Sequence, residues 1–223
     1  MKFFDRLLTV MTKPWAVLSY ISVCIVSFLY LDKPIAYYLH GLDLKTNIPL
    51  VYWCTQLGEG LIYIVSFGLL ALFFRYIRPN KQWEARAWFL WLCVLIPYFI
   101  CGVLKVTLGR ARPELLFNEQ LYGFYGFHTH SPFWSMPSGH TTTITCLVLG
   151  LCILFSRYSI AFILAGVVVI LTRILLTHHY LSDVLVSSYL AFLEVGLLVY
   201  LLKRKAWLKP AYRTIEMEPR LDL

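Results

Sequence analysis

Charged residues are scarce in this chain of 223 residues. Only 14% of the residues are charged, whereas 59% are hydrophobic, and the mean hydropathy is +0.68. A soluble domain has about 25% charged and about 45–50% apolar residues, so this chain has too few charges to cover a surface in contact with water. The same composition excludes a disordered chain, which requires low hydrophobicity. The sequence therefore predicts a membrane protein whose apolar surface faces lipid.

Patterns typical of several other classes are also missing. The apolar stretches are continuous and lack the alternating segments of about ten residues that build a transmembrane barrel. Lipid cannot satisfy the edges of an open sheet, so continuous runs predict helices. The six cysteines form no CxxC pair of the kind used in metal or redox centres. The net charge is +8, but its distribution fits a membrane protein better than a nucleic-acid-binding protein, and we expect no nucleic acid as a partner.

Six apolar segments predict an all-α integral membrane protein, a six-helix bundle with one domain over residues 1–223. The expected spans are residues 15–31, 61–76, 87–104, 139–155, 159–176 and 184–202. Several are shorter than the roughly 20 residues that a bilayer core requires, and aromatic or basic residues at their ends can extend their reach. Residues 109–138 form the longest irregular stretch. A loop of that length is more often functional than passive.

The distribution of basic residues predicts the orientation in the membrane. With a cytoplasmic N-terminus, fourteen of the 20 Lys and Arg residues lie on the cytoplasmic side, namely Lys2, Arg6, Lys13, Arg75, Arg78, Lys81, Arg86, Arg157, Lys203, Arg204, Lys205, Lys209, Arg213 and Arg220. The other six are Lys33, Lys45, Lys105, Arg110, Arg112 and Arg173. This excess follows the positive-inside rule and predicts that both termini are cytoplasmic. Residues 31–34 offer no small-residue cleavage site, so we expect an uncleaved first span.

The first candidate motif follows the third apolar segment. It reads Lys105-Val106-Thr107-Leu108-Gly109-Arg110-Ala111-Arg112-Pro113. Gly109 allows the chain to leave the helix, and Pro113 favours an extended conformation at Arg112. Two or three cations would then face one small volume and suit a multiply charged anion such as phosphate. The alternative is an ordinary basic helix end at the lipid headgroups, and for Arg110 we expect such a contact at the rim.

The second candidate motif, Pro137-Ser138-Gly139-His140, precedes the fourth segment. Ser138 is a suitable N-cap, and Gly139 leaves room for a ligand to approach the backbone. The free N–H groups and the dipole at a helix N-terminus bind anions. His140 could act there as an acid toward a leaving oxygen. Taken alone, the tetrapeptide is equally compatible with a capped helix and an interfacial histidine.

The third candidate motif lies between the fifth and sixth segments, at residues 172–183. Arg173 near the end of a span is costly unless it faces an anion or a carboxylate. His179 and Asp183 are four residues apart and would share one face of a helix. If Asp183 accepts a hydrogen bond from one imidazole nitrogen, the other nitrogen is free to attack an electrophile. Such a His–Asp pair is common in purely structural roles as well.

Topology strengthens these three signals. Counted from a cytoplasmic N-terminus, the third segment ends outside, the fourth begins outside, and the turn from the fifth to the sixth lies outside. All three motifs are therefore expected at one face of the membrane, although they are spread over residues 105–183. The sequence predicts an outward-facing site beside the loop of residues 109–138.

Together the motifs resemble the signature of the type 2 phosphatidic acid phosphatase superfamily, which also includes the vanadium haloperoxidases. That signature is Lys-x6-Arg-Pro, Pro-Ser-Gly-His and Ser-Arg-x5-His-x3-Asp. Residues 105–113 match the first part and residues 137–140 match the second in full. Residues 172–183 match the third in spacing, with Thr172 in place of Ser, a change that keeps the hydroxyl group. The continuous spans exclude a soluble haloperoxidase.

The resemblance implies a role for each matching residue. His179 would attack the phosphorus and form a phosphohistidine, oriented and made more nucleophilic by Asp183. His140 would protonate the departing oxygen and then help to activate the water that hydrolyses the intermediate. The phosphate-binding residues would be Lys105, Arg112, Ser138, Gly139 and Arg173. No carboxylate cluster suited to Mg²⁺ accompanies the motifs, so we expect no metal ion and no cofactor.

The roles of several other polar residues stay open at this point. His178 is an alternative nucleophile, but the spacing favours His179. His128 and His130 could form a metal pair, although an aromatic, Gly-rich loop over the site is the better interpretation. Glu194, deep in the sixth segment, must face the bundle interior or a polar partner.

The leading hypothesis is an integral-membrane phosphatase that removes phosphate from a lipid phosphomonoester or diphosphate at the periplasmic face of a bacterial inner membrane. The resemblance extends to the phosphatases of undecaprenyl diphosphate, phosphatidylglycerophosphate and lipid A, and among these undecaprenyl diphosphate is the first expectation. A lipid phosphotransferase with the same phosphohistidine stays open, because only the acceptor distinguishes the two. The intact motifs disfavour a non-catalytic lipid-binding protein. The expected partners are a lipid phosphate and membrane lipids, with the oligomeric state open.

Overall fold

The computed structural model describes residues 2–204, so Lys205, Lys209, Arg213 and Arg220 of the orientation argument lie outside the described residues. The regular structure of the described part is helical. Its helices are α1 (Lys2–Met11), α2 (Pro14–Val26), α3 (Asp32–Gly41), α4 (Leu44–Asn47), α5 (Pro49–Gln56), α6 (Gly60–Tyr76), α7 (Lys81–Leu108), α8 (Pro113–Glu119), α9 (Gly139–Leu154), α10 (Ser159–Leu175) and α11 (Leu181–Arg204). A π-helical turn, Ser27–Leu31, joins α2 to α3, and short 3-10 turns cover Ser131–Phe133 and Ser156–Tyr158.

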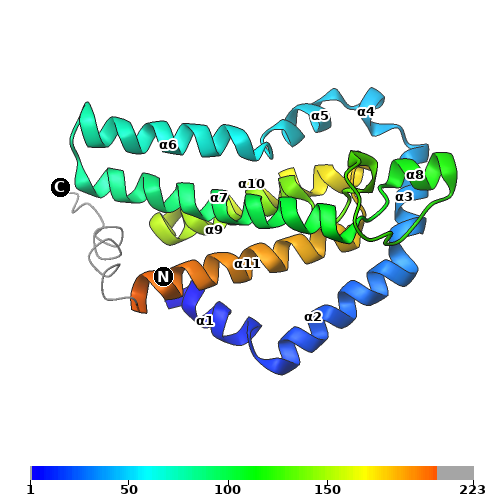
Figure 1. The fold of residues 1–223 in the computed structure, drawn as a ribbon, viewed down its shortest axis with the longest axis horizontal. Coiled ribbons are helices and arrows are strands. Elements are labelled where there is room, and N and C mark those ends of the chain that lie inside the picture. Colours follow the sequence, from blue (N-terminus) through cyan, green and yellow to red (C-terminus); the bar gives the residue numbers. More distant parts are fainter. Residues whose placement is uncertain (1, 205–223) are drawn as a thin grey trace.

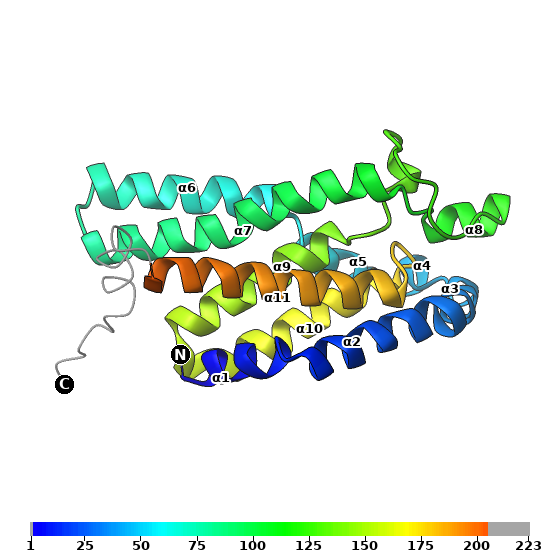
Figure 2. The ribbon, with the colours of Figure 1, turned by 60° about the horizontal axis from the view of Figure 1, so that its bottom comes forward.

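The short helix α9 lies at the centre of the bundle. It packs against α7, α10 and α11, which surround it (Figures 1 and 2). Helix α6 lies along α7, and α2 approaches the first turns of α11 as it runs toward α3 (Figure 1). The residues of α9 are uncharged and small or apolar, as its sequence GHTTTITCLVLGLCIL shows, which suits a helix enclosed by others.

All six expected apolar segments are helical, and the chain is a multi-pass membrane protein. Within the described residues, four helices are long and apolar enough to cross a bilayer, and α5 with α6 makes a fifth if this bent pair is one span. Helix α9 has 16 residues and is therefore only about 24 Å long at 1.5 Å per residue, short of a bilayer core. The number of six crossings therefore remains a prediction.

The first helical segment is longer than expected. We expected the first span to end at Leu31, where charged residues follow, but the helix continues without a break from Pro14 to Gly41. Asp32 does not mark a water-exposed end, because it is buried and accepts hydrogen bonds from Arg110 and Ser182. The loop of residues 109–138 is likewise more regular than expected, since it contains α8.

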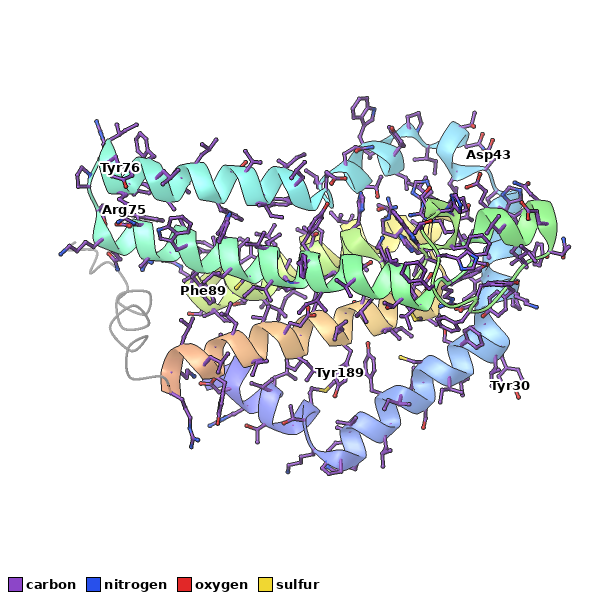
Figure 3. The ribbon with its side chains drawn as sticks, in the orientation of Figure 1. Tyr30, Asp43, Arg75, Tyr76, Phe89 and Tyr189 are labelled. Atoms are coloured by element: carbon purple, nitrogen blue, oxygen red, sulfur yellow. The ribbon has the colours of Figure 1, made fainter. Side chains whose placement is uncertain are left out.

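The apolar core and the polar residues occupy different halves of the bundle. The core cluster is built from the first half of α7 and the final turns of α9 and α11, and it includes Phe89, Leu154 and Val199. Figure 3 shows Phe89 in the body of the bundle, with Arg75 and Tyr76 at one end and Asp43 and Tyr30 toward the other. Large apolar side chains such as Leu18, Leu69 and Leu164 are exposed on the outer faces of α2, α6 and α10, as expected for surfaces in contact with lipid.

Candidate active site

The three motifs meet at one end of the bundle. Helix α7 ends there, α9 begins there, and α10 and α11 are joined there, at the end opposite α1 (Figures 1 and 2). Residues that are far apart in sequence thereby line one cavity of about 630 Å³. The lining includes Lys105, Arg112, Gly139, His140, Arg173, His178 and His179. The structure thus brings together six of the predicted site residues and adds His178.

The first motif leaves α7 as its sequence predicted. Gly109 is the C-cap with a left-handed φ of 55°, and a side chain at this position would begin 1.8 Å from the carbonyl oxygen of Gly126. Only glycine fits such a turn. Arg112 has extended backbone angles (φ −75°, ψ 162°) before Pro113, which starts α8. The chain therefore turns sharply and directs the Arg112 side chain into the cavity.

The second motif caps α9. The Ser138 hydroxyl accepts a hydrogen bond from the Thr141 N–H at 3.4 Å and from the Thr141 hydroxyl at 3.0 Å. Ser138 is fully buried, and its own N–H donates to the Ser187 hydroxyl at 2.6 Å. The hydroxyl therefore lies behind the cavity wall rather than on it, so its expected contact with phosphate stays a prediction. Gly139 leaves room for the ammonium of Lys105, which lies 3.5 Å from the point where a side chain would begin.

The third motif is shaped by a turn after α10. Thr177 has a left-handed φ of 51°, and the turn brings the backbone N–H groups of both following histidines to the carbonyl oxygen of Arg173, at 3.1 Å for His178 and 3.2 Å for His179. These bonds give a partner to a carbonyl oxygen that would otherwise be unpaired at the C-terminal end of α10. They also fix both imidazoles beside the Arg173 side chain at the cavity.

His179 is held in one defined orientation. Its Nδ1 lies 2.7 Å from the carbonyl oxygen of Ser135. Because a carbonyl can only accept, Nδ1 carries the proton and Nε2 carries the lone pair. Asp183 Oδ2 lies 3.6 Å from the same Nδ1, so the carboxylate assists the orientation without making the main hydrogen bond. Burial lowers the pKa of His179 to about 3 against the opposing effect of Asp183, which leaves the imidazole neutral near pH 7.

Asp183 lies directly behind His179 and is completely buried. Its carboxylate accepts hydrogen bonds from Arg110 Nη1 at 2.5 Å, from the Ser135 hydroxyl at 2.6 Å and from the Tyr180 N–H at 2.9 Å. The Tyr180 bond is the reach-back contact of a first-turn carboxylate at the start of α11. A carboxylate with three donors, one of which is an arginine, is held firmly and stays ionised.

Arg110 is not the headgroup contact at the rim that we expected. It is completely buried, and its Nη2 donates to Asp32 Oδ2 at 2.6 Å while Nη1 donates to Asp183 and to the Ser182 hydroxyl. Burial alone would lower the pKa of Arg110, but Asp183 and Asp32 outweigh it and raise the pKa. The rim interpretation was wrong because it assumed that each cation near a membrane face meets lipid. Here two carboxylates from α3 and α11 supply the countercharge.

Asp32 was missed by sequence reasoning. It also accepts a hydrogen bond from the Ser182 N–H at 2.9 Å, a very short one from the Ser182 hydroxyl, and one from Tyr122 at 3.1 Å. Four aromatic rings surround the guanidinium of Arg110, with centroids 4.8–5.7 Å away. A single acidic residue inside a helix of mostly apolar residues was the available signal, since such a charge requires a partner.

The cations that line the cavity have a different environment. In the part of the chain that the structure describes, no carboxylate lies within ion-pair distance of Lys105, Arg112 or Arg173. Arg173 donates a hydrogen bond to the hydroxyl group of Thr55 at 2.6 Å, and Thr55 is a residue of α5 that no motif contains. Burial lowers the pKa of Arg112 against the attraction of the more distant Asp183 and Glu114. Three cations thus share one cavity without direct neutralisation.

The remaining predicted polar residues lie away from the cavity. His128 packs on Phe133 with ring centroids 4.3 Å apart, and its carbonyl oxygen accepts from Trp134 Nε1 at 2.8 Å. Phe127, in the same loop, is exposed, and Trp134 lines the cavity. Glu194 lies in the bundle beside Cys93 and Pro97. Its carboxylate oxygens have no hydrogen-bond partner among the described residues, so of the two expected alternatives, the bundle interior and a polar partner, the structure shows the first.

Comparison with known proteins identifies relatives among bacterial membrane phosphatases. Two proteins named lipid A 1-phosphatase, from Rhizobium johnstonii and Rhizobium etli, are each 36% identical to this chain over 97 residues. The aligned segment covers 44% of this chain and only 40% and 42% of the two relatives. The crystal structure of a transmembrane PAP2 type phosphatidylglycerolphosphate phosphatase from Bacillus subtilis aligns with 92% of this chain and 96% of its own, with 20% identity and a TM-score of 0.43.

The match to a family is broader. The sequence model of the PAP2 superfamily matches residues 86–207. This segment is more than half of the chain, and it contains all three motifs. The chain belongs to the PAP2 superfamily.

Proposed function

We propose that this chain is a membrane phosphatase that removes phosphate from a lipid through a phosphohistidine on His179. The observation that carries the proposal is the single cavity into which three distant chain segments place two catalytic histidines and three cations. Cations that have no carboxylate within ion-pair distance repel one another in a buried site. The arrangement therefore suits a multiply charged anion. A phosphate group satisfies that requirement.

The charges and the orientation of His179 support a two-step reaction. In the first step the lone pair of Nε2 forms a bond to phosphorus while the bond from phosphorus to the lipid oxygen breaks. His140 gives its proton to that oxygen, and the lipid alcohol leaves. In the second step water gives a proton to His140 and attacks phosphorus, which restores His179 and releases inorganic phosphate. Lys105, Arg112, Arg173 and the N-terminus of α9 stabilise the charge on the phosphate oxygens throughout.

The rest of the cavity wall suits a lipid alcohol. Apart from Glu59 and Lys105, the lining residues between the end of α5 and the last turns of α7 are small or largely apolar, namely Gly58, Gly60, Tyr98, Cys101, Gly102 and Val106. A side chain at Gly102 would meet no atom within 4 Å, so the wall has open space at this point. A lipid that entered here would present its phosphate to the cations and its leaving oxygen to His140.

Two lipids are the main candidates for the substrate. The family resemblance led us to expect undecaprenyl diphosphate, and the names of the two Rhizobium relatives point to the 1-phosphate of lipid A. We place lipid A first, because the relatives are 36% identical over 97 residues. Either lipid is consistent with a bacterial membrane and with an active site that faces the periplasm, as the positive-inside rule predicts.

The test is the release of inorganic phosphate by the purified full chain in detergent. The substrates are lipid A, undecaprenyl diphosphate and phosphatidylglycerophosphate, each with and without EDTA, and the control is His179→Ala. We expect phosphate release from at least one lipid, highest with lipid A, unchanged by EDTA and lost in the variant. Absence of release from all three lipids, or undiminished release by His179→Ala, would refute the proposal.

A further inference from the structure

Part of the cavity wall beside His140 comes from a segment that no motif contains. Gly58, Glu59 and Gly60 lie where α5 ends and α6 begins, and the axes of these two helices differ by 42°. All three residues line the cavity. The break therefore brings an acidic residue to the same wall as the second catalytic histidine.

This segment is packed tightly against the first turns of α9. A side chain at Gly58 would begin 2.6 Å from Cδ2 of His140 and 2.8 Å from its Cβ. A side chain at Gly60 would begin 2.7 Å from the Thr143 hydroxyl oxygen. Glycine on both sides of Glu59 allows the backbone to lie directly on α9. The position of Glu59 relative to His140 is therefore fixed by the backbone and does not depend on a flexible loop.

The carboxylate of Glu59 faces the imidazole. Oε2 of Glu59 lies 4.0 Å from Nε2 of His140. The other charged or titratable groups that line the cavity around His140 are Tyr98, Cys101, Lys105, Arg112, Glu114, Arg173, His178 and His179. Within the described residues, Glu59 is the one carboxylate at ion-pair distance from His140. Without it, a protonated His140 would share the cavity with three cations and no close countercharge.

We propose that Glu59 is a positioning residue for the leaving-group step, in which it stabilises the protonated His140 and orients it toward the leaving oxygen. This inference rests on the proposed phosphatase function. An imidazolium has two N–H groups, so Nε2–H faces Glu59 at ion-pair distance and Nδ1–H is the group that gives its proton to the lipid oxygen. When the bond from phosphorus to that oxygen breaks, the second N–H gives up its proton. The neutral ring keeps its Nε2–H toward Glu59, and its Nδ1 takes a proton from the attacking water in the next step.

Leaving-group dependence provides a readout that separates this role from a merely structural one. An alkoxide leaving group requires protonation, whereas p-nitrophenolate leaves without it. We therefore expect Glu59→Gln to lower kcat with dodecyl phosphate by about 30-fold, less than the 10²–10⁴-fold that the general acid itself contributes, because His140 stays in place. With p-nitrophenyl phosphate we expect a loss of less than about threefold, because the general acid contributes little there. A carboxylate that only balanced charge or supported the fold would affect both substrates equally.

Two more variants and the pH profile complete the experiment. Glu119→Gln is the matched control, since Glu119 is exposed at the end of α8 and we expect unchanged activity. Glu59→Asp should recover part of the activity on dodecyl phosphate, and the alkaline limb of the pH profile should move to lower pH in Glu59→Gln. A wild-type chain inactive on both substrates would refute the phosphatase function itself. An active wild type, with equal losses on both substrates or with no loss, would refute the role of Glu59 alone.

Discussion

Arg110 and Arg112 are two residues apart in the same stretch, yet their surroundings are opposite. Arg110 is completely buried between Asp32 and Asp183, with ion-pair distances of 2.6 Å and 2.5 Å. Arg112 lines the cavity, and in the described chain no carboxylate lies within ion-pair distance of it. The first cation has its countercharge in the protein. The second has a place for a countercharge that must come from a ligand.

The difference indicates two roles. Arg110 supports the structure of the site, whereas Arg112 is available to bind a ligand. A buried arginine with two carboxylates fixes α3 and the start of α11, which carries Asp183, relative to one another. A cavity cation contributes little to the fold and, beside Lys105 and Arg173, even opposes it by repulsion between like charges. Sequence spacing alone does not distinguish these roles, because both arginines follow α7 within four residues of its last residue, Leu108.

The largest expected effect follows from the substitution of Arg110, the arginine that supports the site. Arg110→Met leaves two buried carboxylates without their partner, and breaking a buried ion pair in this way costs about 3–5 kcal/mol. We therefore expect a large loss of thermal stability in detergent together with loss of phosphate release. Circular dichroism and a phosphate assay measure the two effects. A variant with the melting temperature of the wild type would show that the Asp32–Arg110–Asp183 cluster does not support the fold.

The matched substitution on the binding side is Arg112→Met. It removes a charge that stabilises the transition state, and loss of one such group lowers kcat by about 10²–10³-fold. The melting temperature should stay the same or rise, because repulsion with Lys105 and Arg173 decreases. The same circular dichroism and phosphate assays apply. Equal destabilisation by both substitutions would eliminate the distinction between the two arginines.

Vanadate binding tests the difference between Arg110 and Arg112 without a substrate. It mimics phosphate and should bind between the cavity cations, inhibit the enzyme and stabilise the folded chain. At about 100 times its dissociation constant, a ligand adds about 2.7 kcal/mol to the free energy of unfolding. We expect this stabilisation in the wild type and its loss at the same vanadate concentration in Arg112→Met, as measured by thermal unfolding. Undiminished stabilisation of that variant would place the anion elsewhere.

The pH dependence has the smallest expected effect. The mechanism requires a neutral His179 and a protonated His140, which predicts a bell-shaped profile. Burial lowers the pKa of His179 to about 3, so the nucleophile is deprotonated above that value and the acidic limb lies below pH 5. The alkaline limb reports loss of the proton from His140, whose protonated form the bound phosphate and Glu59 stabilise against the opposing effects of burial and the cavity cations. A rate that rises about tenfold between pH 5 and pH 7, as for a nucleophile with the ordinary histidine pKa of about 6.5, would contradict this assignment.

The parts of the fold that could be predicted from sequence are those fixed by local chemistry. Gly109 ends α7 in the left-handed conformation, Arg112 is extended before Pro113, and Ser138 caps α9, each as expected. The apolar segments are helical for the same reason, since hydrophobicity and the lack of helix breakers act within one segment. The convergence of the three motifs needed one further assumption, the direction of each span, and the cavity confirms that they lie together.

The parts that could not be predicted depend on contacts between distant segments. Asp32 ended the first span in our prediction because an isolated acidic residue normally marks water, whereas here its partner Arg110 is 78 residues away in sequence. Thr55 contacts Arg173 from α5, and Glu59 reaches the cavity from the bend between α5 and α6, which no local pattern located. The glycines that flank Glu59 were the available signal. Their meaning depends on α9, which packs against them.

The central claim, that His179 carries the phosphoryl group, is tested most directly by trapping the intermediate. The chain with His140→Asn should be incubated with p-nitrophenyl phosphate labelled with ³²P, quenched in alkali and digested, because p-nitrophenolate leaves without His140 whereas hydrolysis of the phosphohistidine is expected to require it. The account predicts an acid-labile, alkali-stable label on His179, absent when His179→Ala is added. A label on His178 or on any other residue, or release of labelled phosphate without any labelled protein, would contradict it.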